Sequence, residues 1–328
     1  MSLHLTDLDT PPDDFLSGEP EGAAFHKAFL AANVPGFQCR YFSVSRDGAR
    51  IAIVPYFLST FSATELLPDG LIKKAFSWIG IGYACVGHPC TDFGAIDGEV
   101  SAEVLDIVNA KLYEKSRLVA YKGFSDLPLR GYTRARGLPV SVLNIAGDYF
   151  STLDSRRRND FRHKLEKAQA LKIEEYSPLP DHLVGDVYRL YMNTYNRAPT
   201  RFERLTPEYF RQTARISKYL VFFEADKPIG FAQIIGKGGK ACFAYVGMDY
   251  DRNRQYGLYY VMCIKGIEAC IKSGHRQMEL GVTSYHFKHL LGAKLVETSL
   301  YYRHSSRAIN WLIGKCKFLL EPEVDELA

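Results

Sequence analysis

The sequence predicts an α/β (α+β) protein of two domains that repeat one plan of helices and strands. Its 328 residues correspond to about two domains of roughly 150 residues each. Hydrophobic residues make up 47% and charged residues 24% of the chain, the balance of an ordinary globular protein. Helix-like and strand-like segments follow one another in a similar order in the two halves, which we place at residues 1–150 and 151–328.

In the first half, only the acidic, proline-containing start Asp7–Pro20 has a composition that favours disorder. Asp47-Gly48 separates two β-rich runs, Tyr41–Val44 and Arg50–Leu58, which is the pattern of a β-hairpin. The other predicted elements of this half are a helix over Pro20–Ala32, a strand over Phe76–Val86, a helix over Val100–Lys115, a strand over Leu118–Lys122, a helical stretch containing Tyr132 to Arg136, and a strand over Leu138–Ile145.

The second half opens with a helix predicted over Ser151–Leu171, which Ser151 or Thr152 could cap. Its basic residues are either a solvated helix face or a site for phosphate groups. The elements predicted after it are helices over Leu183–Tyr195 and Pro207–Ile216, a hairpin of Tyr219–Glu224 and Ile229–Ile235, a strand over Lys240–Met248, a helix over Leu258–Ser273, a strand over Gln277–Val282, a short helix over Phe287–Leu291, a strand over Leu295–Arg303 and a helix over Ala308–Leu320.

Five short stretches carry a resemblance to the Fem-type and CelD/BioF2-like branch of the GNAT acyltransferases. They are TDFG at Thr91–Gly94, SRRRNDFR at Ser155–Arg162, FAYVGMD at Phe243–Asp249, MELG at Met278–Gly281 and YHFKHLLGA at Tyr285–Ala293. The resemblance extends over roughly Phe25 to Arg303. It implies two tandem GNAT-like domains, each a mixed, mostly antiparallel sheet flanked by helices, with the transferase site in the second domain.

The resemblance also implies an acyl-CoA-type donor whose phosphates lie at a strand-to-helix turn, where backbone N–H groups and the helix dipole favour an anion. Arg254 and Gly257 match the start of the superfamily's Arg/Gln-x-x-Gly-x-Gly/Ala pattern, but Tyr259 replaces its last small residue. An arginine-rich turn that caps a helix is the alternative interpretation. The predicted donor-binding residues are Val246, Met248, Arg252, Arg254, Gln255, Tyr256, Gly257 and Leu258.

Acyl transfer to an amine needs a base and groups that stabilise the developing oxyanion. The predicted catalytic residues are Glu279, Asp92, Lys288, His286 and Tyr245. Glu279 could act as the base or hold the amine, and His286 could take a proton near neutral pH. By resemblance, Asp92 faces the acceptor between the two domains. Each of these residues also has an ordinary structural interpretation. Glu279 could be a strand-end acid paired with a lysine, His286 a surface histidine, and Asp92 part of an Asx turn before Gly94.

Two further residues are predicted to bind the acceptor. Arg197 could hold a carboxylate through two parallel hydrogen bonds, although arginine is also common at a helix C-terminus. Tyr285 belongs to the YHFKHLLGA stretch. No metal is predicted, because His88 and Cys90 are two possible ligands without a second cluster.

Net charge, cysteine spacing and the lack of targeting signals restrict the classes of function that the sequence supports. The net charge of +4 does not indicate nucleic-acid binding on its own, and none of the seven cysteines forms a CxxC pair. No signal peptide or membrane-spanning run is predicted, so the cytoplasm is expected.

The sequence favours an N-acyltransferase that moves an acyl group from an acyl-CoA-type thioester to an amine acceptor. The alternatives are an aminoacyl-tRNA-dependent Fem-type transferase, favoured by the basic helix, and a non-catalytic tandem GNAT binding module, favoured by Tyr259 in the donor turn.

Overall fold

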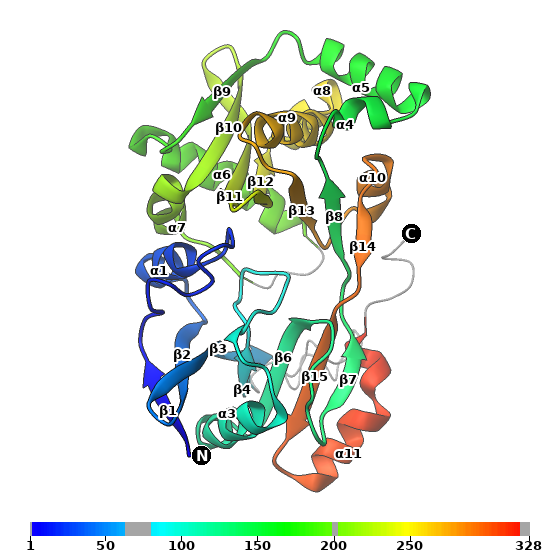
Figure 1. Ribbon diagram of the computed structural model, residues 1–328. Helices are drawn as coiled ribbons and strands as arrows, with labels where there is room; N and C mark the ends of the chain where they lie inside the picture. The colour runs from blue at the N-terminus through cyan, green and yellow to red at the C-terminus, as the bar shows by residue number, and fades with distance from the viewer. Residues whose placement is uncertain (1, 63–79, 199–202, 322–328) are drawn as a thin grey trace. The chain divides into compact units, whose positions relative to one another are not determined.

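The computed structural model describes residues 2–62, 80–198 and 203–321 (Figure 1). The chain forms two compact units, each made of discontinuous segments. Unit 1 comprises Met1–Phe15, Gly36–Val140 and Val296–Ala328, and unit 2 comprises Leu16–Pro35 and Ser141–Leu295. Compared with a single division after residue 150, unit 2 also takes an N-terminal segment, and unit 1 also takes the C-terminal segment.

Unit 1 is a sheet in the order β1-β2-β3-β4-β6-β15-β7, with β5 beside β3. The pairs between its described strands are antiparallel except β4–β6, which is parallel. Helix α3 (Ala102–Lys115) packs four fully buried side chains into the core, Val104, Leu105, Val108 and Leu112. The strands are β1 (Leu3–Leu8), β2 (Gln38–Arg46), β3 (Ala49–Ser62), β4 (Gly80–Val86), β5 (Asp97–Gly98), β6 (Leu118–Phe124), β7 (Thr133–Arg136) and β15 (Ser299–His304); α11 (Arg307–Lys315) and η3 (Lys317–Leu320) follow β15.

The sheet of unit 2 has the order β14-β8-β13-β12-β11-β10-β9. Its strands are β8 (Val140–Asn144), β9 (Lys172–Tyr176), β10 (Ser217–Glu224), β11 (Lys227–Lys237), β12 (Lys240–Met248), β13 (Gln277–Gly281) and β14 (Lys294–Val296). Its helices are α1 (Ala23–Ala32), α4 (Tyr149–Thr152), α5 (Ser155–Lys167), α6 (Asp181–Arg197), α7 (Pro207–Thr213), η2 (Ala214–Ile216), α8 (Tyr250–Tyr256), α9 (Leu258–Lys272) and α10 (Tyr285–Leu290). Nine residues of α9 are buried, which makes this helix the centre of the unit's core.

Most predicted elements are present. Both predicted hairpins form, as β2–β3 and β10–β11, and the strand Lys240–Met248 is found with the predicted bounds. The structure also shows two mixed, mostly antiparallel sheets with helices, which confirms the predicted fold class. The part of the predicted strand Phe76–Val86 that precedes Gly80 lies outside the described residues.

Four predictions of local structure were wrong. Tyr132–Arg136 is not helical, because Thr133–Arg136 pairs with β15. The helix predicted from Ser151 begins at Ser155, where the Asp154 side chain accepts a hydrogen bond from Arg157 N. Leu295–Arg303 is divided between β14 and β15, which lie in different sheets.

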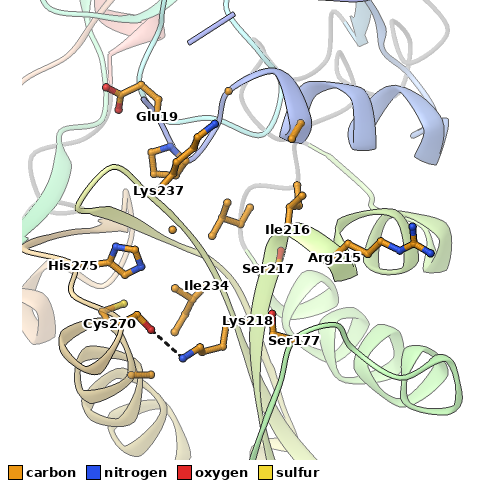
Figure 2. Close-up of a pocket in the computed structure, with 17 residues that line it drawn as sticks. Glu19, Ser177, Arg215, Ile216, Ser217, Lys218, Ile234, Lys237, Cys270 and His275 are labelled. Carbon is orange, nitrogen blue, oxygen red and sulfur yellow. Dashed lines mark hydrogen bonds between the residues drawn. The ribbon is translucent and has the colours of Figure 1, made fainter. Parts of the chain in front are cut away.

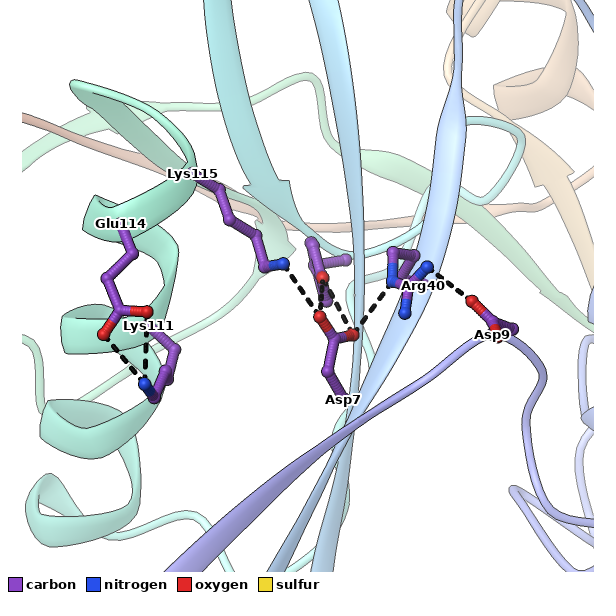
Figure 3. A network of polar contacts seen from close by, with 7 residues as sticks. Asp7, Asp9, Arg40, Lys111, Glu114 and Lys115 are labelled. Carbon is purple, nitrogen blue, oxygen red and sulfur yellow. Dashed lines mark hydrogen bonds and ion pairs between the residues drawn. The ribbon is translucent and has the colours of Figure 1, made fainter.

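The fourth wrong prediction is disorder in Asp7–Pro20. Strand β1 pairs with β2 through Leu8, and the Phe15 side chain is completely buried. An ion network explains how this acidic start becomes ordered (Figure 3). The Asp7 carboxylate lies 2.8 Å from Lys115 Nζ and 3.0 Å from Arg40 Nε, and it accepts a hydrogen bond from the Tyr56 hydroxyl. The network thus fastens β1 to β2, β3 and α3.

Burial opposes ionisation of Asp7, but hydrogen bonds from Lys115, Arg40 and Tyr56 outweigh it, so the pKa of Asp7 lies below its usual value of 3.8. A carboxyl group with a lowered pKa stabilises the fold at neutral pH, and this contribution disappears as the pH falls through the folded-state pKa. We therefore expect Asp7→Asn to lower the free energy of unfolding by about 1–2 kcal/mol at pH 7 and by much less at pH 3.

Urea unfolding of the full chain at both pH values measures this difference. Asp9→Asn is the matched control, because Asp9 is exposed and contacts only Arg40 of this network. Equal losses for the two variants at pH 7 would contradict the assignment.

Candidate functional site

Two neighbouring strands of unit 2 separate after a short parallel stretch. β12 pairs with β13 only from Lys240 to Cys242, whereas it pairs with β11 as far as Met248. A bulge marks the separation, because the register with β11 omits Ala244 between Phe243 and Tyr245. Among the described strands, none pairs with the other edge of 243–248. Backbone N–H and C=O groups on such an edge can bind an extended ligand, as a further strand would.

Close helix contacts hold the free part of β12 in place. A Cβ added to Gly247 would lie 2.5 Å from the Leu190 carbonyl carbon and from Tyr191 N, so α6 touches the strand backbone. A Cβ added to Gly266 of α9 would lie 2.7 Å from the Phe243 ring. Asn193 Nδ2 also donates to the Met248 carbonyl at 3.2 Å. The two glycines therefore let α6 and α9 approach β12 closely enough to fix its position.

The predicted donor turn is mostly helical. α8 occupies Tyr250–Tyr256, and the Asp249 carboxylate caps it by accepting from Asp251 N and Arg252 N. Gly257 has a φ of 64° and directs the chain into α9. The Asn253 side chain accepts from Tyr259 N at 3.0 Å. The backbone amides of Asp251, Arg252 and Tyr259 thus already have acceptors within the protein.

The cations of this turn differ in their environment. Arg252 Nε lies 2.9 Å from Glu224 Oε2, and Arg252 Nη1 donates to Gln255 Oε1 at 3.1 Å. The Tyr256 hydroxyl donates to Glu224 Oε1 at 2.8 Å. Arg252 and Tyr256 therefore anchor α8 to the β10–β11 hairpin. Arg254 is exposed and its Nη1 lies 4.0 Å from Asp251 Oδ1, so it is the arginine of α8 best placed to meet a ligand.

Tyr259, which departs from the superfamily pattern, has its side chain inside unit 2. Its ring contacts Phe287 of α10, with ring centres 5.3 Å apart, and its hydroxyl bonds Ser284 and Cys263. Burial raises the pKa of the Cys263 thiol to about 12, against the opposing charge of Lys288. The large side chain at Tyr259 therefore joins α9 to α10.

Tyr245 forms a contact that the sequence did not predict. Its hydroxyl donates to Glu203 Oε1 at 2.7 Å, and its ring packs edge-on against the rings of Tyr191 and Tyr209. The Tyr191 hydroxyl donates to the Glu203 carbonyl at 3.0 Å and holds this segment. Glu203 lies in a connection without a recognisable motif, so no signal in the sequence marks it as a partner of Tyr245.

Glu279 lies on the same face of the sheet as Tyr245. Its neighbours Met278 and Leu280 are buried in the core around α9, so strand alternation directs Glu279 to the opposite face. Tyr245 is opposite Gln233, which likewise alternates with core residues of β11. Three groups of this face thus come from different segments: Glu279 from β13, Tyr245 from β12 and Glu203 from the connection before α7.

The α10 residues are divided by exposure. Tyr285 and Lys288 are buried, with 3% of Lys288 exposed, whereas His286 is exposed. Residues two apart on a helix do not face each other, so His286 and Lys288 are not brought together. Arg197 lies 4.1 Å from the centre of the Tyr250 ring, at the start of α8. The structure therefore places Arg197 beside the predicted donor segment.

Asp92 belongs to unit 1, where the corresponding parallel pair is arranged differently. β4 ends at Val86, which is its last residue paired with β6, and the following loop bonds the end of β6 through Gly94 N and the Gly123 carbonyl at 2.9 Å. A Cβ added to Gly123 would lie 2.4 Å from the Asp92 carbonyl oxygen. This loop occupies the position where β12 continues in unit 2, so the described part of unit 1 has no equivalent free strand edge.

A pocket of about 410 Å³ in unit 2 lies away from this site (Figure 2). It is lined by the ends of β10 and β11 and by the C-terminal end of α9. Its polar lining includes Glu19, Ser177, Arg215, Lys218, Lys237 and His275. Lys218 donates to Ser273 Oγ at 3.0 Å, and Figure 2 shows Arg215 and Lys237 on different sides of the pocket. The cations therefore do not converge on one ligand position.

Within the described segments, no group of three or more His, Cys, Asp or Glu side chains is arranged to hold a metal ion. The helices of the same segments include none with the length and apolar character to cross a membrane.

Comparison with known proteins agrees with this geometry. Residues 155–289 match the family profile of the acetyltransferase (GNAT) domain. The chain is 25% identical over 169 residues to the putative 8-amino-7-oxononanoate synthase 2 of Mycobacterium tuberculosis, a match that covers 48% of this chain and 22% of that protein. The matched part is thus about a fifth of the length of the curated relative.

Three solved structures share the fold over most of the chain. A tandem GNAT protein from the clavulanic acid biosynthesis pathway is 11% identical, with a TM-score of 0.56, and the match covers 93% of this chain and 99% of that one. FemX is 12% identical, with a TM-score of 0.54 and coverage of 85% and 91%. L-PGS from Bacillus licheniformis is 12% identical, with a TM-score of 0.55 and coverage of 87% and 90%.

The matched segment identifies residues 155–289 as a domain of the GNAT acetyltransferase class. Within that class, this chain has the tandem GNAT fold shared with FemX and L-PGS, and it has a homologue of the oxononanoate synthase type. Both the class and the tandem arrangement were predicted from the sequence.

The contact at Gly247 yields a test of the site's construction. Gly247→Ala places a methyl group against the α6 backbone, so we expect a loss of about 1–3 kcal/mol in stability. Gly185→Ala in the same helix is the control: its Cβ meets nothing within 4 Å, and we expect a gain of about 0.5–1 kcal/mol. Chemical denaturation measures both, and a neutral Gly247→Ala would show that α6 does not depend on this close approach.

Proposed function

We propose that this protein is an N-acyltransferase that transfers an acyl group from an acyl-CoA-type thioester to an amine. The observation that supports it most is the separation of β12 from β13 inside the segment that matches the GNAT acetyltransferase domain. It leaves a fixed strand edge, 243–248, followed directly by two helix starts.

The strand edge suits the amide-containing arm of the donor. Backbone groups of 243–248 would bind the donor amides as a neighbouring strand does, with Val246 and Met248 as the predicted contacts. The phosphates would lie near the start of α9 and the exposed Arg254, with Gly257 and Leu258 at the turn. Arg252, Gln255 and Tyr256 would shape this segment through their contacts with one another and with Glu224.

Side chains on one face of the sheet could carry out the transfer. The amine nitrogen attacks the thioester carbonyl, and its proton passes to the Glu279 carboxylate. The C–S bond breaks as the Tyr245 hydroxyl turns from Glu203 and gives its proton to the leaving sulfur. Solvent then takes the proton from Glu279 and returns one to Tyr245. Glu203 orients Tyr245 through the 2.7 Å hydrogen bond. Asp92, Lys288 and Tyr285 stay predicted contributors to the acceptor site, whereas the exposed position of His286 does not favour a role for it.

This function predicts separate effects on binding and chemistry. Acetyl-coenzyme A should bind saturably in calorimetry. Glu279→Gln should leave that binding within about twofold and lower the rate of coenzyme A thiol release with a panel of primary amines by about 10²–10⁴-fold. Glu268→Gln is the matched control, because Glu268 pairs with Lys265 on α9.

If the donor binds but Glu279→Gln reacts like the parent protein, Glu279 is not the base. If acetyl-coenzyme A does not bind at all, the acyl-CoA donor is excluded and a binding module or another donor is left.

A second candidate function uses an aminoacyl-tRNA as donor, and helix α5 favours it. Several basic residues of α5 have acidic partners: Arg157 pairs with Asp154, and Lys164 pairs with Asp160. Arg156, Arg162 and Lys167 of the same helix are exposed. Three exposed cations on one short helix can contact a phosphate backbone.

Under the tRNA hypothesis, the double variant Arg156→Gln/Arg162→Gln should weaken tRNA binding. It should also reduce the slope of the logarithm of the binding constant against the logarithm of the salt concentration by about 1–2. Filter binding between 50 and 200 mM salt measures both quantities. The variant Arg189→Gln changes an arginine of α6 outside this helix and serves as the control. Salt-independent or absent binding of tRNA by the parent protein would leave the acyl-thioester donor as the better explanation.

A further inference from the structure

Unit 2 has a second pocket, of about 320 Å³, between α5, α9 and the start of β9. The buried residues Ala168, Leu171 and Val261 form its apolar inner part, and the exposed residues Arg162 and Gln169 lie at its entrance. The volume is at the lower end of the range of small-molecule sites. The pocket can therefore hold one planar ring system whose polar groups face the entrance.

The pocket lies at the end of unit 2 that carries the predicted donor turn. Helix α9 contacts both α5 and α8 (Figure 1). Val261 is three residues after Leu258, where α9 begins, which is about 5 Å along the helix axis. On the β9 side, Ile173 pairs with Phe222, two residues before the Glu224 that α8 binds. A ligand whose phosphates lie at the start of α9 could thus extend directly into the pocket.

Gln169 gives the entrance a group that can recognise adenine. A side-chain amide can accept a hydrogen bond from the exocyclic amine of adenine and donate one to its N7. The carboxylate of Glu166 also lines the pocket, but its Oε2 lies 3.1 Å from His163 Nδ1 on the same helix. We therefore assign recognition of the ring to Gln169.

Arg162 supplies a cation for a phosphate at the same entrance. Its guanidinium can bind a phosphate group through two parallel hydrogen bonds. Lys265 also lines the pocket, but it is in an ion pair with Glu268, with 2.8 Å between Nζ and Oε2. Arg162 is therefore the better placed of the two cations to meet a phosphate.

Coenzyme A combines these two chemistries, because its adenosine carries a 3′-phosphate and is joined to the pantetheine arm by a pyrophosphate. We propose that the pocket between α5 and α9 binds the adenine ring of the acyl-CoA donor and that Arg162 binds its 3′-phosphate. This inference rests on the proposed function and makes its donor more specific. The pantetheine arm of a carrier-protein thioester has no adenosine and would leave the pocket empty.

Calorimetry of the full chain with acetyl-coenzyme A and acetyl-dephospho-coenzyme A, which lacks the 3′-phosphate, tests the phosphate contact. The parent protein should bind the first about fivefold or more tightly than the second. Arg162→Gln should weaken binding of acetyl-coenzyme A about fivefold or more and that of the dephospho form by less than twofold. Arg276→Gln, an exposed position after the C-terminal end of α9, is the matched control and should change neither by more than twofold.

Displacement of acetyl-coenzyme A by nucleoside bisphosphates tests the ring contact. Adenosine 3′,5′-bisphosphate should compete about fivefold or more better than inosine 3′,5′-bisphosphate, in which a carbonyl oxygen replaces the exocyclic amine. Gln169→Ala should reduce this preference to less than about twofold. Gln212→Ala, at an exposed position of α7, should leave the preference unchanged.

The outcomes separate the inference from the proposed function. Equal binding of the two acetyl donors by the parent protein, or equal losses for Arg162→Gln and Arg276→Gln, would overturn the inference and leave the acyl-CoA donor in place. An adenine preference that Gln169→Ala retains would overturn the assignment of the ring to this pocket. If acetyl-coenzyme A does not bind at all, the proposed function fails and the inference fails with it.

Discussion

The candidate site depends on the unequal pairing of β12 with its two neighbours. Its antiparallel pairing with β11 continues to the end of the strand, while its parallel pairing with β13 stops after Cys242. One extra residue, Ala244, is enough to produce this difference, because a bulge bends one strand and increases its local twist. Every other feature of the site follows from where the bent strand leads: the free edge, the α8 cap and the turn at Gly257.

The two sheets have a similar arrangement of strands but differ after their parallel pairs. Each sheet contains a parallel pair, β4–β6 in unit 1 and β12–β13 in unit 2. In unit 1 the chain turns back after β4, and the loop from His88 to Gly94 bonds the end of β6. In unit 2 the equivalent strand runs on, and its edge stays free of the described strands. This contrast gives a physical reason for assigning the donor site to the second half alone.

The sequence predicted elements whose signals are local. The Asp47-Gly48 hairpin and the apolar run of α9 depend on residues close together in the chain, and both were found. Prediction from the sequence failed where contacts between distant segments determine the structure. An example is β7, which is a strand because β15 pairs with it. The same limit applies to the site. The position of Tyr245 could be predicted from its motif, but its partner Glu203 could not, because a hydrogen bond across 42 residues leaves no periodic trace.

The position of β15 has a consequence for synthesis of the chain. This strand lies between β6 and β7 in the sheet of unit 1, and Leu127 N donates to the Tyr301 hydroxyl across a sequence separation of 174 residues. A ribosome therefore releases all of unit 2 before it delivers the strand that joins β6 to β7. Until β15 is synthesised, β6 and β7 each lack the strand that pairs with them in the complete sheet of unit 1. The part of the molecule that is translated first is thus the part that is completed last.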